Sequence, residues 1–357
     1  MAREPIIQSD AQSGAQSGGP TDRTSPETED DRRLRPRWMR DMVGQREVFA
    51  RLEIAINAAR IRKEPLGHIL FDGPPGLGKT TFATVIPNEL GVPLQMASGA
   101  VLEAPRDLMP YLSNAEAGSV LFIDEIHRMN KSVEEFLYPA MEDFRIDITL
   151  GEGVNARIIN MQLQPFTLIG ATTRTGLLSA PLRDRFQLRE HLDFYSDEEL
   201  AEIVTRNAAK LDTTAAAEAC LEIAIRSRGT PRIANNHLRW VRDYATSETE
   251  DGRVTFEVAQ AALKMAKIDR RGLDSQDRKY LQTLIDVYGG GPAGVEAIAH
   301  TMNIASDTLE DDVEPFLLRI GLVIRTPRGR QVTPAGYHHL GLTPPDEPDN
   351  SEQQSLF

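Results

Sequence analysis

The chain has 357 residues, enough for two or three domains with separate cores, and its hydrophobic and charged fractions of 40% and 26% are ordinary for a globular protein. Its one cysteine, Cys220, excludes an intrachain disulfide, and no apolar stretch approaches the roughly 20 residues that a membrane-spanning helix needs. The first residues also lack the apolar segment of a signal peptide, so we expect a cytoplasmic protein without a membrane partner.

The net charge of −13 is concentrated at the two ends of the chain. Residues 1–31 carry −5 and residues 341–357 carry −4, which leaves only −4 for everything between them. Both ends are rich in polar residues, glycine or proline, and we expect residues 1–33 and 343–357 to be disordered acidic tails. The body as a whole neither attracts nor strongly repels DNA, so any DNA contact must be local.

After the first tail, a helical pattern begins near Gly44, and apolar runs at residues 68–71, 119–123 and 166–171 are typical of buried strands. Helical stretches separate these runs, which predicts a parallel sheet with crossover helices over residues 34–195. Ligands bind such sheets at the carboxyl ends of the strands. Each of the three predicted strands ends in residues suited to phosphate chemistry.

Residues 196–267 show only helical periodicity, with a capping box of Ser196 and Glu199 and a later helix that begins at Pro231. Residues 268–342 combine three helical stretches with a two-strand pattern, which is the order of a winged helix. The predicted fold class is therefore α/β: a P-loop parallel sheet with crossover helices, then a helical lid domain, then a C-terminal winged helix.

The first predicted strand leads into the sequence GPPGLGKT at residues 73–80. This glycine-rich pattern between a strand and a helix is the context of a phosphate-binding P-loop, and a purely structural turn is the weaker interpretation. Backbone N–H groups and the positive end of the helix would hold the phosphates of ATP. We expect Lys79 to bridge the β- and γ-phosphates and the Thr80 hydroxyl to ligate Mg²⁺.

The second predicted strand ends in Asp124 and Glu125. An aspartate at this place can complete the Mg²⁺ site, and a neighbouring glutamate can act as the general base that activates water. Two such acids alone would more often be a solvated strand end, but their position after the P-loop favours catalysis. Thr173 ends the third strand, where it can orient the water or sense the γ-phosphate; a turn-forming hydroxyl is the competing interpretation.

Two arginines lie where they can reach phosphate groups. Arg185 follows the nucleotide-binding core and can reach the ATP of a neighbouring subunit, as an arginine finger that typically accelerates hydrolysis by ~10³–10⁵. Arg232 is the second residue of the helix that begins at Pro231, so it can contact phosphate and couple the helical domain to the nucleotide state. A single surface arginine is usually only solvated, and the functional interpretation of these two arginines depends on their positions in the sequence.

Together these motifs are typical of AAA+ ATPases, and longer strings are more specific. GPPGLGKTT, VLFIDEIHR, VEEFLYPAMEDF, PFTLIGATTR, PLRDRF, RGTPRIAN and RTPRGR occur in this order, so the chain resembles the RuvB family from about residue 34 to residue 345. The resemblance implies a large AAA+ domain, a small helical ATPase domain and a winged-helix head. It also implies a homo-hexameric ring on duplex DNA that drives branch migration of four-way junctions, with a RuvA-like junction-binding partner and a RuvC-like resolvase.

The resemblance further implies roles for individual residues. It places nucleotide contacts at Leu34, Arg35, Gly76, Gly78, Lys79, Thr80, Thr81, Glu142, Asp143, Phe144, Tyr195 and Arg232, with Arg185 as the finger that acts in trans. It places DNA contacts at Arg325 and Arg330. Arg328 joins them in the same predicted hairpin turn, where three cations suit phosphates without reading base sequence. A solvated turn would have the same pattern.

Residues 145–163 predict a β-hairpin inserted before the third strand, with Ile146, Ile148 and Leu150 alternating along its first strand. In the RuvB family the equivalent hairpin binds RuvA, so we expect these three side chains to bind a RuvA-like partner. An apolar face on a projecting hairpin is typical of a partner site. The competing interpretation is that the face packs on its own domain.

Two other functions remain open at this point. A clamp-loader-like AAA+ switch would share the ATPase motifs but would not need a basic wing. A winged-helix transcription regulator whose ATP site controls assembly would read bases with a recognition helix, but the candidate helix at residues 306–321 is acidic, which argues against its insertion among phosphates.

The chain also departs from the family pattern. Asp72 puts a negative charge before the P-loop, which would lower nucleotide affinity unless its side chain points away, and Pro87 removes one hydrogen bond from the predicted P-loop helix.

Overall fold

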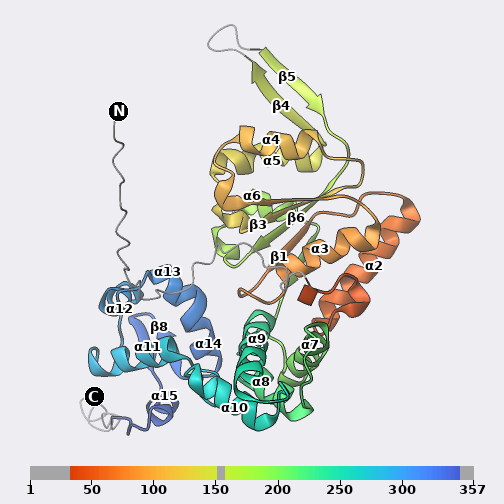
Figure 1. Ribbon diagram of the computed structural model, residues 1–357. Coiled ribbons are helices and arrows are strands. Elements are labelled where there is room, and N and C mark those ends of the chain that lie inside the picture. Colours follow the sequence, from red (N-terminus) through yellow and green to blue (C-terminus); the bar gives the residue numbers. More distant parts are fainter. Residues whose placement is uncertain (1–32, 151–156, 346–357) are drawn as a thin grey trace, which may run out of the picture.

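The computed structural model describes residues 33–150 and 157–345, and a parallel sheet between layers of helices forms its first region (Figure 1). In spatial order the strands are β2 (Leu94–Ser98), β3 (Val120–Asp124), β6 (Thr167–Thr172), β1 (Ile69–Asp72) and β7 (Leu188–His191). All neighbours pair in parallel. The three predicted strands are the central ones and their carboxyl ends lie together, which confirms the predicted fold class.

Helices cover both faces of this sheet because successive buried strand residues point into two different cores. The helices and short helical turns of the region are η1 (Met39–Asp41), α2 (Arg46–Arg62), α3 (Lys79–Leu90), η2 (Gly99–Val101), α4 (Pro105–Ser113), η3 (Ile126–Arg128), α5 (Lys131–Glu142), η5 (Thr175–Leu177) and α6 (Ala180–Asp184). Ile69 and Phe71 share a core with α2 and α3, whereas Leu70 and Leu121 share the other core with α4 and α5. Helix α3 continues past Pro87 to Leu90.

The predicted hairpin is present and projects from the end of the sheet that lies farthest from the head (Figure 1). Its strands β4 (Arg145–Leu150) and β5 (Arg157–Gln162) are antiparallel, with Ile146 opposite Met161 and Ile148 opposite Ile159. Ile146 is fully buried in the core of the sheet region, whereas Ile159 is 48% exposed. The base of the hairpin therefore belongs to the core, and apolar side chains become exposed only farther out.

Four helices follow and form the lid: α7 (Asp197–Lys210), α8 (Ala217–Ile225), α9 (Pro231–Glu248) and α10 (Phe256–Met265). Ser196 and Glu199 make the predicted capping box, and Pro231 occupies the first turn of α9, as predicted. Leu200, Leu238 and Leu263 belong to the same continuous core as Ile69 and Phe71 of the sheet. The lid and the sheet region thus share one hydrophobic core.

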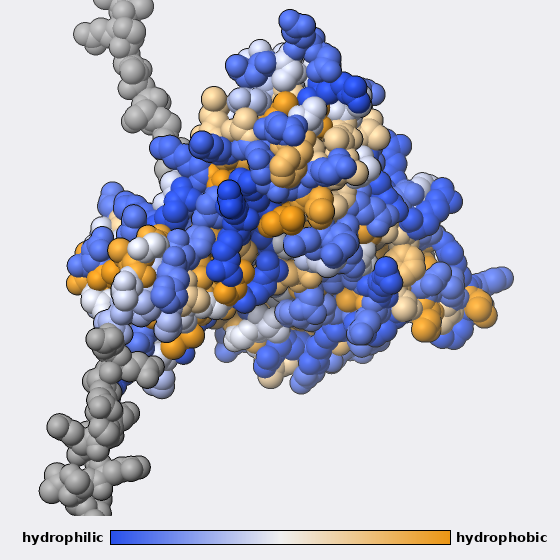
Figure 2. All heavy atoms as spheres, turned by 90° about the horizontal axis from the view of Figure 1, so that it is seen from below, coloured by the Kyte–Doolittle hydropathy of each residue, from blue (hydrophilic) through white to orange (hydrophobic). Residues whose placement is uncertain are grey.

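The winged-helix head has a core of its own. Its elements are α11 (Ser275–Asp286), α12 (Val295–Met302), α13 (Ser306–Thr308), the π-helical turn η6 (Leu309–Val313), α14 (Glu314–Arg319), β8 (Val323–Thr326), β9 (Gly329–Val332) and α15 (Pro334–His339). Strands β8 and β9 form the antiparallel wing. The underside of the molecule in Figure 1 is predominantly hydrophilic, with apolar side chains in small separate groups (Figure 2).

Arg228 joins the lid to the head. Its guanidinium lies 2.8 Å from the Asp274 carboxylate and 2.6 Å from the fully buried Asp277 carboxylate, and it stacks over the Phe316 ring. Within the part of the chain that the structure describes, no helix is both long and apolar enough to cross a membrane.

Candidate nucleotide site

The P-loop connects the end of β1 with the start of α3, at the centre of the sheet. Its glycines Gly73, Gly76 and Gly78 all have positive φ angles, which only glycine adopts without strain. Lys79 is buried, and its Nζ donates to the carbonyl oxygens of Gly73 at 2.7 Å and Pro74 at 2.9 Å. Burial lowers the pKa of Lys79 to about 8, against the opposing effect of the Glu125 and Asp124 carboxylates. The lysine is therefore held inside the loop in a mostly charged state at neutral pH.

The carboxyl end of β3 lies next to the P-loop helix. The Thr80 hydroxyl is 3.4 Å from Asp124 Oδ2, so two oxygen donors of the kind that Mg²⁺ prefers converge at one point. Asp124 Oδ1 also accepts the backbone N–H of Glu125 at 3.0 Å. These residues fit a magnesium ion held between the loop and β3.

Glu125 follows Asp124 with a φ angle of +49°, in the left-handed region that non-glycine residues rarely adopt. Burial raises the pKa of Glu125, and the nearby Asp124 carboxylate raises it further. A carboxylate with a raised pKa, carried by a backbone at positive φ beside a phosphate-binding loop, is suited to accept a proton.

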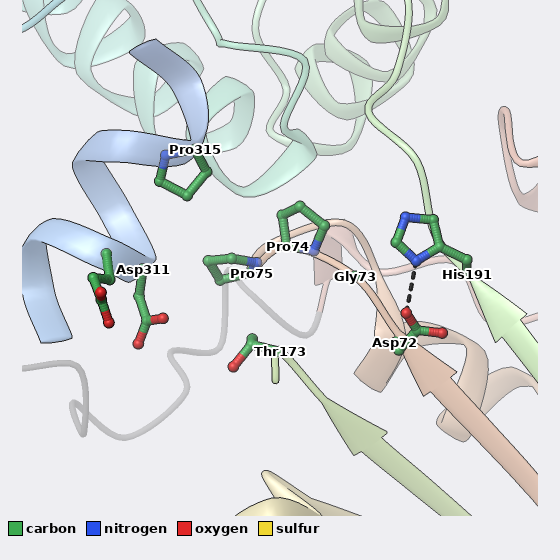
Figure 3. A pocket seen from close by; sticks show the side chains of 9 residues that line it. Asp72, Gly73, Pro74, Pro75, Thr173, His191, Asp311 and Pro315 are labelled. Carbon is green, nitrogen blue, oxygen red and sulfur yellow. Dashed lines mark hydrogen bonds and ion pairs between the residues drawn. The ribbon is translucent and has the colours of Figure 1, made fainter. Parts of the chain in front are cut away.

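Thr173 follows β6 and lines a cavity of about 180 Å³ in front of the P-loop (Figure 3). Asp72 lies at the edge of this cavity, but its Oδ2 is 2.7 Å from His191 Nδ1 (Figure 3). The Asp72 carboxylate is paired with the imidazole of His191 at the edge of the sheet, and its negative charge still acts on Lys79.

His127 contacts the proposed base, and the sequence analysis did not predict this contact. Its Nε2 lies 3.4 Å from Glu125 Oε2, and its Nδ1 lies 2.9 Å from Thr172 Oγ1. The D-E-x-H spacing was the available signal. A short helical turn, η3, brings the imidazole back to the glutamate.

A second cavity lies between the sheet region and the lid. It is lined by five of the residues expected to contact nucleotide, namely Leu34, Arg35, Gly78, Thr81 and Tyr195. The buried Tyr195 hydroxyl donates to the carbonyl oxygen of Leu77 at 3.3 Å, and burial raises the pKa of Tyr195 to about 12. The cavity is thus continuous with the start of the P-loop helix, where the nucleoside part of a bound nucleotide would be expected.

Arg232 approaches the P-loop from helix α9 of the lid. Its backbone N–H donates to the carbonyl oxygen of Gly76 at 3.4 Å. A Cβ atom at Gly76 would lie 2.7 Å from the Thr230 methyl group and 3.1 Å from Arg232 Cβ. Only glycine therefore allows the lid to approach the loop this closely.

Arg185 does not meet the P-loop of its own chain. Its guanidinium stacks 4.1 Å from the centre of the Tyr138 ring, and its Nη2 is 3.0 Å from Glu142 Oε1. Asp143 and Phe144 continue this segment, and none of residues 142–144 lines the two cavities described above.

The expected partner residues need one correction, and two of the expected DNA residues already have a carboxylate partner. Ile146 is fully buried in the domain core and is not available on the hairpin surface, whereas Ile148 is half-buried; the side chain of Leu150 lies outside the described part of the structure. In the wing, Arg328 is exposed, but Arg325 and Arg330 both pair with the buried Glu314. The wing is therefore not a row of three free cations.

Comparison with known proteins gives a consistent result along the chain. Family models match the RuvB P-loop domain at residues 34–192, the RuvB AAA lid domain at 195–269 and the RuvB C-terminal winged helix domain at 270–341. The Holliday junction branch migration complex subunit RuvB of Rhodopirellula baltica is 64% identical over 315 residues, which cover 88% of this chain and 86% of the relative.

Solved structures agree with the sequence relatives. The RuvB Holliday junction branch migration motor of Thermotoga maritima is 45% identical, with a TM-score of 0.80 over 88% of this chain and 100% of that one. A substitution variant of the same protein is 46% identical, with a TM-score of 0.81 over 88% and 100% of the two chains. The chain therefore belongs to the RuvB family of Holliday junction branch migration motors and is a P-loop AAA+ ATPase.

Proposed function

We propose that this protein hydrolyses Mg-ATP to drive branch migration of duplex DNA at four-way junctions, in recombination and DNA repair. The convergence of Lys79, Thr80, Asp124 and Glu125 at the carboxyl ends of strands of one parallel sheet supports the ATPase part most directly. Residues 34–195, 196–267 and 268–342 would act as the large ATPase domain, the small ATPase domain and the DNA-binding head, all in the cytoplasm.

In the hydrolysis that we propose, each polar group has a separate task. Lys79 would leave its carbonyl partners to contact the β- and γ-phosphates, and Thr80 and Asp124 would hold Mg²⁺, which would neutralise phosphate charge. Glu125 accepts a proton from the attacking water, which Thr173 orients. The rest of the nucleotide would be surrounded by Leu34, Arg35, Gly76, Gly78, Thr81 and Tyr195. Arg232 on the lid would contact the phosphates and so couple the position of the lid to the nucleotide state.

The position of Arg185 supports a closed ring. The guanidinium lies beside Glu142 and Tyr138 and does not line the cavity in front of its own P-loop, so we propose that it completes the site of a neighbouring subunit. Repetition of such a head-to-tail contact generates a ring when the rotation closes, and we propose that this ring is a homo-hexamer. The segment Glu142, Asp143 and Phe144 would then contact the same neighbouring nucleotide.

The two ends of the chain would hold different partners. We propose that Arg325, Arg328 and Arg330 of the wing contact DNA phosphates. Glu314 restrains Arg325 and Arg330, whereas Arg328 is exposed. At the opposite end, the outer part of the hairpin with Ile148 and Leu150 would bind a RuvA-like protein. A RuvC-like resolvase would then act on the junction held by the complex.

The experiment that tests this function is dissociation of a synthetic four-way junction by the protein with a RuvA partner and ATP. Wild type is expected to move the junction, and E125Q to bind ATP but stall, because the glutamine cannot accept the proton of water. If wild type hydrolyses ATP yet never moves the junction, a clamp-loader-like switch becomes the better assignment. A sequence-selective footprint on duplex DNA would instead favour a transcription regulator.

A further inference from the structure

His127 fills the space between the proposed general base and the end of strand β6. Its side chain is 7% exposed, with Nε2 3.4 Å from Glu125 Oε2 and Nδ1 2.9 Å from Thr172 Oγ1. Thr172 is fully buried, so the second contact is fixed by the sheet itself. The imidazole is therefore a rigid link from the sheet to a catalytic carboxylate.

The hydrogen bonds around Thr172 allow His127 to accept at Nδ1. Thr172 Oγ1 accepts the backbone N–H of Arg174 at 3.0 Å, so its own hydrogen can be donated to His127 Nδ1. Burial lowers the pKa of His127, and the Arg174 charge lowers it further, which favours the neutral ring. A neutral imidazole that accepts at Nδ1 carries its proton at Nε2, the nitrogen that lies 3.4 Å from Glu125 Oε2.

We propose that His127 is a positioning residue that holds Glu125 Oε2, so that Oε1 remains available to accept the proton of the attacking water. The backbone of Glu125 is already constrained at a φ angle of +49°. Its side-chain torsions are the freedom that remains, and the imidazole restricts them. This inference rests on the proposed role of Glu125 as the base.

Two substitutions of His127 separate its two contacts. In H127Q the side-chain amide can take the place of Nε2 and still donate to Glu125, whereas in H127N it can replace only Nδ1 and keep the Thr172 contact. We expect H127N to lower kcat for ATP about tenfold or more, with KM changed less than about twofold, and H127Q to lose clearly less. Thermal unfolding and binding of a non-hydrolysable ATP analogue show that both variants are folded.

The comparison has outcomes that would overturn the proposal. Equal losses of kcat in H127N and H127Q, or a loss confined to KM, would mean that the Nε2 contact does not position the base. E125Q in the same assays tests the proposed base separately. If E125Q keeps wild-type kcat, the proposed function fails, whatever the histidine variants do.

Arg174 carries a second, independent inference, because it joins the ATP site to the head. Its Nε donates to Asp311 Oδ1 at 3.1 Å, and its Nη2 donates to Asp311 Oδ2 and Asp307 Oδ1, both at 3.0 Å. Glu310 Oε2 lies at 4.0 Å from the same Nη2. The bidentate contact with Asp311 holds this acidic turn of the head, which comprises Asp307, Glu310 and Asp311, beside the end of β6.

This contact lies at the phosphate end of the nucleotide site. Glu310, Asp311 and Pro315 of the head line one wall of the cavity whose other wall is Thr173 and the first residues of the P-loop (Figure 3). A γ-phosphate bound by the loop would therefore bring negative charge close to the carboxylates of the head. It would also attract the guanidinium of Arg174.

We propose that Arg174 and the acidic turn form a latch that holds the head at the ATP site until a γ-phosphate is bound. The triphosphate repels Asp311 and competes with it for Arg174, so binding of ATP releases the head. ADP lacks the competing phosphate and leaves the latch closed. The latch adds a mode of regulation to the proposed motor and rests on that function.

The double variant D307N/D311N tests the latch, because it keeps the shape of both side chains and removes their charge. We expect it to tighten binding of a non-hydrolysable ATP analogue about fivefold and to leave the Kd for ADP within about twofold of wild type. The matched control is D286N/E296Q, which removes two exposed carboxylates of the head away from Arg174. It is expected to change neither Kd.

Equal changes for the two nucleotides, or the same change in the control variant, would show general electrostatics and overturn the latch. No change in either Kd would overturn it as well. Titration of wild type in parallel tests the proposed function on its own, because a motor of this kind must bind both nucleotides.

Discussion

The buried carboxylate of Glu314 connects the wing to the helices of the head, and its removal has a predictable effect. Oε1 accepts hydrogen bonds from the Tyr280 hydroxyl and Arg330 Nε, both at 2.9 Å. Oε2 accepts from Arg325 Nη2 at 2.6 Å and from Arg330 Nη2 at 3.2 Å. Glu314 itself is fully buried, so these partners are its only source of compensation for lost hydration.

The variant E314Q keeps the size of the side chain and removes its charge. The glutamine amide would point N–H donors at arginines that also donate, so the contacts of one oxygen are lost. Breaking a buried ion pair typically costs about 3–5 kcal/mol. Because the Arg325 side chain is half exposed, solvent weakens its contribution to the ion pair with Glu314. We therefore expect the head to lose about 3 kcal/mol of stability.

Native-state hydrogen exchange of the backbone amides in β8 and β9 measures this loss directly. The opening free energy of the wing should fall in E314Q, while the amides of α3 in the ATPase region stay unchanged. The matched control is E310Q, because Glu310 also contacts Arg330 at 3.0 Å but is partly exposed. It should lose less than about 1 kcal/mol. If E314Q loses no more than E310Q, the buried cluster does not hold the wing.

Three further predictions concern the loop, the lid and pH. In G76A the added methyl group would lie 2.7 Å from Thr230 at a positive φ angle, so ATP affinity should fall about tenfold in a nucleotide titration; an unchanged Kd would contradict the close approach of the lid. S196A loses the N-cap contact with Glu199 and should cost about 1 kcal/mol in urea unfolding, and a loss no larger than in the exposed-site control S247A would refute this. Burial lowers the pKa of His237 to about 4, below its ordinary value, so the unfolded chain binds the proton more readily between these values. Burial of the neutral imidazole therefore costs no stability above the ordinary pKa of histidine, and the folded state loses stability as pH falls from there toward 4. H237Q should therefore flatten the fall of Tm between about pH 7 and pH 5, and parallel curves for variant and wild type would contradict the assignment.

Local sequence patterns predicted the helix cap, the P-loop and the central strands, because each of these features is determined by residues that are close together in the chain. The capping box at Ser196 and the glycine-rich loop before Lys79 each depend on a few neighbouring residues, and the structure has them where the sequence placed them. The apolar runs likewise identified the three central strands to within one residue. The outer strand β2 has no fully buried residue, so it left no such signal.

What the sequence did not reveal depends on residues that are far apart in the chain. The alternation of the hairpin could not show that Ile146 lies within the core, because that depends on the helices beneath it. The RTPRGR turn could not show that Glu314 already binds Arg325 and Arg330. The acidic helix argued against base recognition, but its contact with Arg174 becomes visible only when the head and sheet are seen together.

The core that the lid shares with the sheet limits how this ATPase can move. Leu238 and Leu263 of the lid are as completely buried as Phe71 and Phe82 of the sheet region, in one continuous cluster. A wide swing of the lid would expose part of that cluster to water, at roughly 25 cal/mol for every Å² uncovered. Small rotations that keep the cluster closed are the movements such a joint permits. Large displacements would then arise where contacts are polar and exchangeable, as they are where Arg174 and Arg228 attach the head.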